Sequence, residues 1–176
     1  VVVANAYSFG LKSVTLLDVM LLAGFYTLRI FAGGVATDTP VSQWLLLFSL
    51  FFFLGLAFQK RVAELRSWTD VHKKHNRRGY VKTDIEHLRT AGTVSSYLAL
   101  LVLALYIQSP DVTTHYARPD MLWWIIPCLL YWTSRVWLLA GRGHVSEDAI
   151  DYAIKDVTSY AIGALVVVIL LLSHPH

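Results

Sequence analysis

Three ionisable residues follow directly after a long apolar run, and their spacing suggests chemistry with phosphate or a metal ion. Residues Val41 to Phe58 carry no charge, and Lys60, Arg61 and Glu64 come immediately afterwards. In a helix, Lys60 and Glu64 share one face because they are four residues apart. A carboxylate there can ligate Mg²⁺, and a lysine can bind phosphate as a point charge. The alternative is that these residues only end a helix at the membrane interface.

A second candidate lies inside an apolar segment. Arg29 follows the start of the segment from Val14 to Thr37 by about fifteen residues, which places it deep in a bilayer by helical rise. Ionisable groups at that depth usually face the interior of a helix bundle and have a function. Tyr26 and Gly33 share its helical face, and a small residue there permits close approach of a helix or ligand. A structural arginine bound by carbonyl groups is the alternative.

The last polar loop offers a further set of acids. Asp148, Tyr152 and Asp156 recur at fourfold spacing, which places them on one face of a short helix. They can help to ligate Mg²⁺ or bind an acceptor, although charge pairs and helix capping explain them equally well. Arg135, late in the preceding apolar segment, is a candidate ion-pair partner for one of these acids.

Composition decides what kind of protein carries these residues. Of 176 residues, 56% are hydrophobic and 15% are charged, against about 25% charged in soluble domains. Uniformly apolar segments favour helices over a membrane barrel. We expect an all-α polytopic bundle with about five full spans after a truncated first one, and no separate soluble domain. The segments are Val1 to Phe9 (truncated), Val14 to Thr37, Val41 to Phe58, Gly92 to Gln108, Met121 to Ala140 and Val157 to Ser173.

Cations are concentrated in alternate connections. Lys12, the loop from Gln59 to Thr90 and the loop from Gly141 to Asp156 fall on one side, and that side is predicted to be cytoplasmic. Attraction to anionic lipid headgroups explains most charges of the long loop, and binding to nucleic acid is a poor reading of a membrane loop. The lone Cys128 excludes a disulfide within the chain and fits a packing role.

Several ordered blocks resemble a known family. They include NAYSFGLK (Asn5 to Lys12), the string from Gly24 to Leu65 with YTLR, AGG and KRVAEL, RRGY (Arg77 to Tyr80) and YWTSRVWLLAGRG (Tyr131 to Gly143). Together they resemble the later part of the UbiA superfamily of intramembrane prenyltransferases. The similarity is closest to the bacterial branch of decaprenyl-phosphate phosphoribosyltransferases and of proteins fused to a haloacid-dehalogenase-like domain. It covers essentially the whole chain.

The resemblance implies a fold and a gap. Residues 1–176 would form part of a nine-helix UbiA-type membrane domain that lacks the N-terminal helices. The family's first aspartate-rich motif, NDxxDxxxD, binds the Mg²⁺-diphosphate of the isoprenoid, and this motif is absent from the sequence. The chain also opens without Met, so we expect a fragment of something longer. We expect it to be inactive alone unless another polypeptide supplies the missing helices.

The resemblance also assigns roles to residues. The second family motif, commonly DxxxD, aligns with Lys60 and Glu64. The lysine implies that Lys60 with Arg61 binds phosphate where the family holds a second metal ion. Glu64 keeps a metal-ligand role, and Asp148 of the last loop is the other candidate ligand. Tyr7 and Lys12 resemble the family's YxxxK element, where Lys12 would neutralise a leaving diphosphate. A simple topology signal is the alternative for Lys12. The family's capping loop implies that Arg77, Arg78 and Tyr80 close over a phosphorylated substrate. Arg29 is a further candidate substrate contact because of its depth in the span, not because of the resemblance.

Three classes of function remain open from the sequence. They are a Mg²⁺-dependent transferase of the bacterial inner membrane, a transporter with Arg29 at its midplane, and a non-catalytic membrane subunit. The family blocks favour the transferase, which would bind a polyprenyl phosphate or diphosphate from the lipid bilayer and a phosphorylated or aromatic co-substrate. Phosphoribosyl transfer to polyprenyl phosphate fits the Lys60 substitution best, and aromatic prenylation is the alternative.

Overall fold

The computed structural model describes residues 15–39, 41–67, 79–110, 112, 116–142 and 156–173. The predicted truncated first span lies outside these residues. Five predicted site residues also lie outside them: Tyr7, Lys12, Arg77, Arg78 and Asp148.

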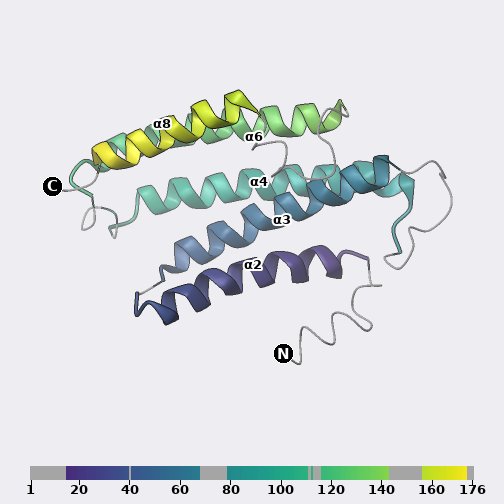
Figure 1. Ribbon diagram of the computed structural model, residues 1–176, viewed down its shortest axis with the longest axis horizontal. Helices are drawn as coiled ribbons and strands as arrows, with labels where there is room; N and C mark the ends of the chain where they lie inside the picture. The colour runs from purple at the N-terminus through teal and green to yellow at the C-terminus, as the bar shows by residue number, and fades with distance from the viewer. Residues whose placement is uncertain are drawn as a thin grey trace.

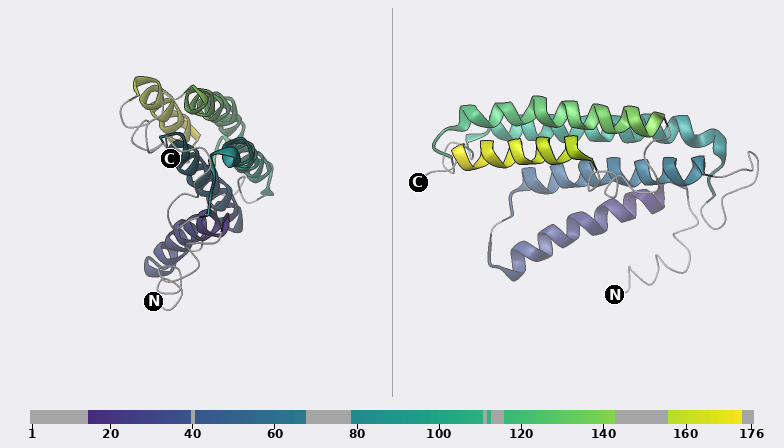
Figure 2. Two further views of the ribbon diagram at one scale, coloured as in Figure 1. Left: turned by 90° about the vertical axis from the view of Figure 1, so that its right-hand side faces the viewer. Right: turned by 45° about the horizontal axis from the view of Figure 1, so that its top comes forward.

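Five apolar helices form the described part of the molecule. They are α2 (Leu17–Ala36), α3 (Gln43–Arg66), α4 (Ile85–Ile107), α6 (Ile125–Gly141) and α8 (Val157–Ser173), with short 3₁₀ turns η2 (Lys82–Asp84) and η3 (Pro119–Trp124) before α4 and α6. Consecutive helices run in alternate directions, and α2 lies at one edge of the bundle with α3 between it and the other helices (Figures 1 and 2). The described residues contain no strand, so the prediction of an all-α membrane bundle is confirmed.

Helix lengths agree with four of the predicted spans, and the fifth helix is shorter than the others. The helices α2 and α3, and the segments 82–107 and 119–141, are each long and apolar enough to cross a membrane. The fifth, α8, has the predicted bounds but only 17 residues. Two boundaries differ from the predicted apolar runs, since α3 continues to Arg66 and α4 already begins at Ile85. Polar residues therefore extend the helices beyond their apolar runs, and Lys60 lies within α3.

Glycine allows the closest helix contact in the bundle. A Cβ atom added at Gly55 of α3 would lie 2.4 Å from the Ser96 hydroxyl oxygen of α4. A Cβ atom added at Gly92 of α4 would lie 2.4 Å from the Trp137 ring and 2.8 Å from Cβ of Phe58. The absence of a side chain at these two positions thus lets α3, α4 and α6 approach one another.

The main core lies at the end of the bundle where α3 ends and α4 begins. Buried apolar side chains from α2, α3, α4 and α6 meet there around Tyr80, which is fully buried. A second core at the opposite end joins η3, α6 and α8, and the amide of Ala117 donates to the Ser173 carbonyl over 3.1 Å. The two cores fix both ends of the bundle and leave space between its helices midway.

Candidate functional site

A buried ionic cluster joins three distant parts of the chain. The Asp18 carboxylate of α2 accepts from Arg61 Nη2 of α3 over 2.6 Å and from the Tyr80 hydroxyl over 2.6 Å. Arg61 Nη1 also donates to Glu64, one turn later in α3. Asp18, Arg61 and Tyr80 are at most 3% exposed. Arg61 is therefore bound between two carboxylates.

Local backbone geometry places Tyr80 in this cluster. Gly79 has φ of 72°, a left-handed conformation that glycine adopts without a Cβ clash. The chain then turns inward, and the Tyr80 hydroxyl accepts the Leu16 amide at the start of α2 over 2.8 Å. The Arg61 guanidinium lies 5.5 Å from the centre of the tyrosine ring. Tyr80 thus joins the end of the long basic loop to the beginning of α2.

The cluster holds two carboxylates, Asp18 and Glu64, around one guanidinium, so Arg61 offsets only part of its negative charge. Burial and the hydrogen bond to Asp18 raise the pKa of Tyr80 above its usual value, so the hydroxyl stays protonated and donates. The predicted role of Arg61 as a phosphate ligand stays a prediction, and in this geometry both of its terminal nitrogens already donate to carboxylates. The arrangement suits Arg61 to hold Glu64 in place.

Asp18 is the member of the cluster that the sequence analysis missed. It begins α2 and lies inside the predicted apolar segment from Val14 to Thr37. The signal was present, because an ionisable residue within a membrane segment is a functional candidate by the same rule that selected Arg29.

Lys60 and Glu64 occupy the last turns of α3 and are both half-buried. They continue the i, i+4 row of Phe48, Phe52 and Leu56. Each four-residue step turns by about 40° around the helix, so Lys60 lies near the face of Leu56, and Glu64 is turned by about 80° from Leu56. This row connects the predicted polar site to a cavity.

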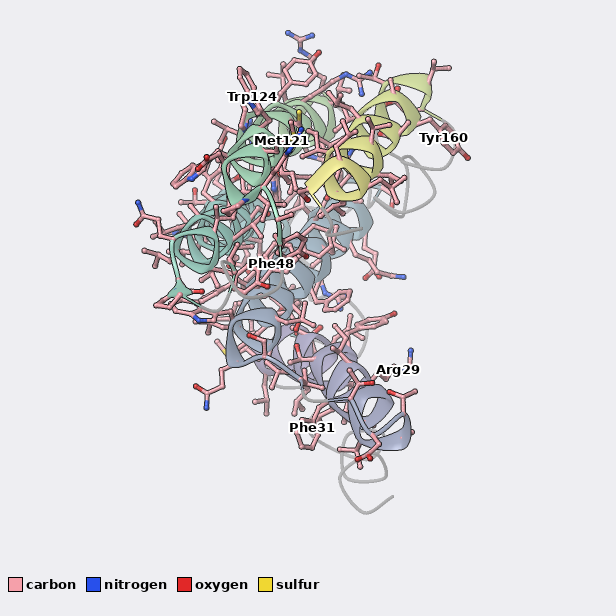
Figure 3. The ribbon with its side chains drawn as sticks, turned by 90° about the vertical axis from the view of Figure 1, so that its left-hand side faces the viewer. Arg29, Phe31, Phe48, Met121, Trp124 and Tyr160 are labelled. Carbon is pink, nitrogen blue, oxygen red and sulfur yellow. The ribbon has the colours of Figure 1, made fainter. Side chains whose placement is uncertain are left out.

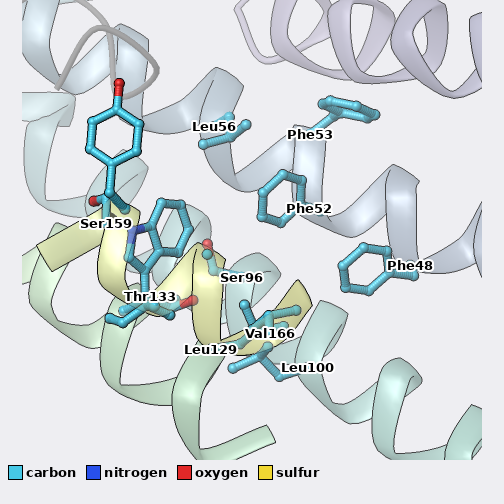
Figure 4. A pocket seen from close by; sticks show the side chains of 14 residues that line it. Phe48, Phe52, Phe53, Leu56, Ser96, Leu100, Leu129, Thr133, Ser159 and Val166 are labelled. Atoms are coloured by element: carbon cyan, nitrogen blue, oxygen red, sulfur yellow. Dashed lines mark hydrogen bonds between the residues drawn. The ribbon is translucent and has the colours of Figure 1, made fainter. Parts of the chain in front are cut away.

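The cavity is apolar and lies between α3, α4, α6 and α8. Its volume is about 570 Å³, within the range of small-molecule sites. Phe48, Phe52 and Leu56 of α3 face Leu129 of α6 and Val166 of α8 across it (Figure 4). The shape and lining suit a flexible hydrocarbon chain.

A second polar network stands beside this cavity, where α8 begins. Arg135 donates twice to Asp156, over 2.5 and 3.0 Å, which confirms that it pairs with an acid of the last loop. Asp156 also accepts from the Ser159 amide over 2.9 Å, and Trp132 Nε1 donates to the Ser159 hydroxyl over 2.9 Å. These bonds, led by the one from Arg135, lower the pKa of Asp156 to about 2.

One predicted residue, Arg29, differs from its expected position, and one residue that was not predicted, Gln59, is buried. Arg29 was expected to face the interior of the bundle, but among the described residues it lies exposed on the edge helix α2 (Figure 3). Its guanidinium lies 5.3 Å from the centre of the Tyr26 ring. Gln59 is 2% exposed, and its Nε2 atom has no hydrogen-bond partner within the described part of the chain.

The described residues do not complete a metal site. Nowhere in the described ranges do three or more His, Cys, Asp or Glu side chains gather around one point. Both oxygens of Asp18 already accept hydrogen bonds, and Glu64 is bound by Arg61. Glu64 can supply one carboxylate, and the other predicted metal ligand, Asp148, lies outside the described residues.

Comparison with known proteins shows several relatives. The chain is 36% identical over 163 residues to an uncharacterized protein, y4nM, of Sinorhizobium fredii, covering 92% of this chain and 32% of that protein. It is 32% identical over 144 residues to the nodulation protein NoeC of Azorhizobium caulinodans, covering 81% and 47%. It is 34% identical over 113 residues to a decaprenyl-phosphate phosphoribosyltransferase of Mycolicibacterium smegmatis, covering 63% and 35%.

These matches define how far the similarity reaches. The chain spans between about a third and a half of the length of these relatives. No profile of a known protein family matches it. The similarity to decaprenyl-phosphate phosphoribosyltransferases agrees with part of the predicted resemblance, and a link to the dehalogenase-fused branch stays a prediction.

Proposed function

We propose that the chain is part of an intramembrane transferase whose lipid substrate is a polyprenyl phosphate. The observation that carries the proposal is the apolar cavity of about 570 Å³, whose α3 wall ends at Leu56, one helical turn before Lys60. A hydrocarbon tail fits the cavity, and an anionic headgroup fits the polar end of the same row. The names of the mycobacterial and related relatives support this substrate class.

The cavity volume limits how much of the tail it can take. A cavity of roughly 150 Å³ holds benzene, which has six carbon atoms. At the same ratio, 570 Å³ holds about 23 carbon atoms, or four to five isoprene units. A longer tail must continue outside the cavity into the bilayer, so chain length beyond this limit should affect binding weakly.

Chemistry at the polar end follows from the charges of both substrates. In phosphoribosyl transfer, an oxygen of the polyprenyl phosphate attacks the anomeric carbon of a pentose diphosphate, and diphosphate leaves with the electrons of the broken bond. Both reactants are anionic, so the Lys60 ammonium would offset their repulsion and stabilise the leaving group. Arg61, fixed by Asp18, would position Glu64 beside it. We place this end of the bundle at the cytoplasmic face of a bacterial inner membrane, as the positive-inside rule assigns it.

The metal requirement remains part of the proposal. We expect Mg²⁺, with Glu64 as one ligand and the others outside the described residues. When bound, the ion would neutralise charge on the diphosphate. A chelator should then abolish transfer, and added Mg²⁺ should restore it.

Transfer of labelled pentose to lipid tests the proposal. Membranes that contain this chain together with the part of the Sinorhizobium relative outside the match are incubated with polyprenyl phosphate and a labelled pentose diphosphate. We expect label in the lipid extract. In a parallel incubation with labelled polyprenyl diphosphate and a phenolic acceptor, label in the phenol would instead support aromatic prenylation. Label in neither product would contradict a catalytic role.

A pair of glycine variants tests the cavity itself. Gly163 lines the cavity and Gly24 lies outside it, and a Cβ atom added at either position meets nothing within 4 Å. Gly163→Leu should fill part of the cavity and lower kcat/KM for polyprenyl phosphate by about tenfold, the effect of ~1.4 kcal/mol. Gly24→Leu should leave it unchanged. Equal effects of both variants would remove the cavity from the proposal.

A further inference from the structure

Arg29 places a charge near the middle of a membrane span. It lies twelve residues after the first residue of α2, about 18 Å along a helix about 30 Å long. Its guanidinium lies 5.3 Å from the ring centre of Tyr26, which stands at the midpoint of the same helix. The charge is therefore close to the centre of the hydrocarbon layer if α2 spans it.

The direction of the Arg29 side chain keeps its guanidinium from extending to the nearer membrane surface. Arg29 is seven residues, about 10 Å, from the end of α2 at Ala36. Side chains of a helix point toward its N-terminus, which here leads away from that end and toward the centre of the bilayer. The contact with Tyr26, one turn earlier, shows this direction. Contact with lipid alone would leave the charge in hydrocarbon, which is costly.

Two other arginines show which groups bind a guanidinium within the spans of this bundle. Arg61 of α3 is bound by Asp18, and Arg135 of α6 is bound by Asp156. Each of them has a carboxylate partner within hydrogen-bonding distance. Arg29 has no ion pair or hydrogen bond to any residue in the described ranges, so its counterpart must come from elsewhere.

The surface around Arg29 has space for a group that binds its guanidinium. A hollow of about 500 Å³ lies along this flank of α2, and Arg29 shares its lining with Leu22, Phe25, Tyr26, Leu28 and Ala32. Arg29 lies on α2, the helix at the edge of the bundle (Figure 3). By contrast, the exposed surface of α8 carries no charge and, apart from Tyr160 in its first turn, is apolar, so it can face lipid.

We infer that the Arg29 flank of α2 is the docking site of a membrane-spanning helix from outside these 176 residues, and that this helix carries an Asp or Glu at the level of Arg29. Charge complementarity identifies the occupant, because Arg61 and Arg135, which lie within spans, each bind a carboxylate, whereas Arg66 at the end of α3 binds a backbone carbonyl. The curated relatives extend over about two to three times the matched length, and we assign the helix to the counterpart of their unmatched part. The inference rests on membrane insertion and is independent of the reaction proposed above.

Site-directed photo-crosslinking in the cells that make the protein tests the inference. A cysteine replaces Ala32, an exposed residue one turn from Arg29, in a Cys128→Ser background and carries a benzophenone label. The matched control is Ala164→Cys on the exposed surface of α8. We expect the Ala32 probe to yield a peptide adduct with an apolar segment that contains Asp or Glu, and the Ala164 probe to label lipid.

The charge of Arg29 provides the decisive comparison. Arg29→Gln removes the charge without impeding membrane insertion and should lower the adduct yield by about tenfold or more, whereas Arg29→Lys should retain most of it. Three results would overturn the inference: lipid adducts alone at Ala32, an adduct with a second copy of this chain, or a yield that Arg29→Gln leaves unchanged. None of these readouts depends on transferase activity.

Discussion

Replacing Asp18 by Asn should destabilise the protein, because it removes one of the two carboxylates that bind the buried Arg61. The change keeps the shape of the side chain but removes the negative charge that lies 2.6 Å from Arg61. Loss of one partner from a buried ion pair costs about 3–5 kcal/mol. Glu64 still contacts Arg61 and is 23% exposed, so the lower end, about 3 kcal/mol, is expected.

Tyr80→Phe provides a graded comparison within the same cluster. It removes the donor to Asp18 and the acceptor of the Leu16 amide. Hydrogen bonds to charged groups contribute about 1.5–3 kcal/mol, so a loss of about 2 kcal/mol is expected. Because both changes act on one network, Asp18→Asn combined with Tyr80→Phe should cost less than the sum by at least about 0.5 kcal/mol.

Unfolding in mixed micelles of increasing SDS content, followed by tryptophan fluorescence, measures these differences. Asp120→Asn is the matched control, since Asp120 is an exposed acid at the opposite end of the bundle. Its free energy of unfolding should change by less than about 0.5 kcal/mol. If Asp18→Asn also stays within that limit, the ion pair with Arg61 does not hold α2 against α3, and the reasoning about Glu64 fails with it.

The sequence predicted the helices well because apolar length is a strong signal. The bounds of α8 agree with the predicted segment at both ends, and α2 differs from its segment by a few residues. Boundaries failed where polar residues continue a helix beyond the membrane. Hydropathy does not predict the last two turns of α3 or the first two of α4, because these turns carry polar residues. They are helical because their polar side chains bind other residues of the bundle.

The contacts of the candidate site were harder to predict from the sequence than the helices were, for a physical reason. Spacing shows which residues share a face of one helix, but it does not show which residues of different helices meet. The pairing of Arg61 with Asp18 joins positions 43 residues apart, and that of Tyr80 with Asp18 joins positions 62 apart. Arg135 and Asp156 could be paired from the sequence because a short connection brings consecutive helices together.

Arg29 shows the limit of a general rule. An ionisable residue in a span usually faces the interior of a bundle, but the rule does not say how much of the bundle these residues form. Within the described part, the side of α2 that contacts α3 carries Val19 and Ala23, both fully buried, and Arg29 lies on a different side. The prediction about orientation was therefore wrong for the described bundle.

Three further predictions concern the site and its support. In the complete protein, Lys60→Ala and Glu64→Ala should each abolish lipid-linked transfer while membrane insertion stays normal, and turnover in both variants would remove them from the site. Because the pKa of Asp156 is lowered from its usual value of 3.8 to about 2 in the fold, its ion pair stabilises the fold above about pH 4 and loses this effect as pH falls toward 2. The stability difference between wild type and Asp156→Asn should shrink over that interval in acid-unfolding curves. Finally, Gly92→Ala should weaken the packing of α4 against α3 and α6.

The Gly92 prediction sets two opposing effects against each other. Alanine favours a helix over glycine by about 1 kcal/mol, but overpacking a filled core costs about 1–3 kcal/mol. At Gly92 the new methyl group would lie 2.4 Å from the Trp137 ring and 2.8 Å from the Cβ atom of Phe58, which is fixed to the backbone of α3. The packing cost should therefore exceed the gain. At Gly24, where the methyl group meets nothing within 4 Å, only the gain remains, so Gly24→Ala should stabilise the protein in the same SDS titration. If both variants stabilise it, the close approach of α4 to α3 and α6 does not limit packing at Gly92.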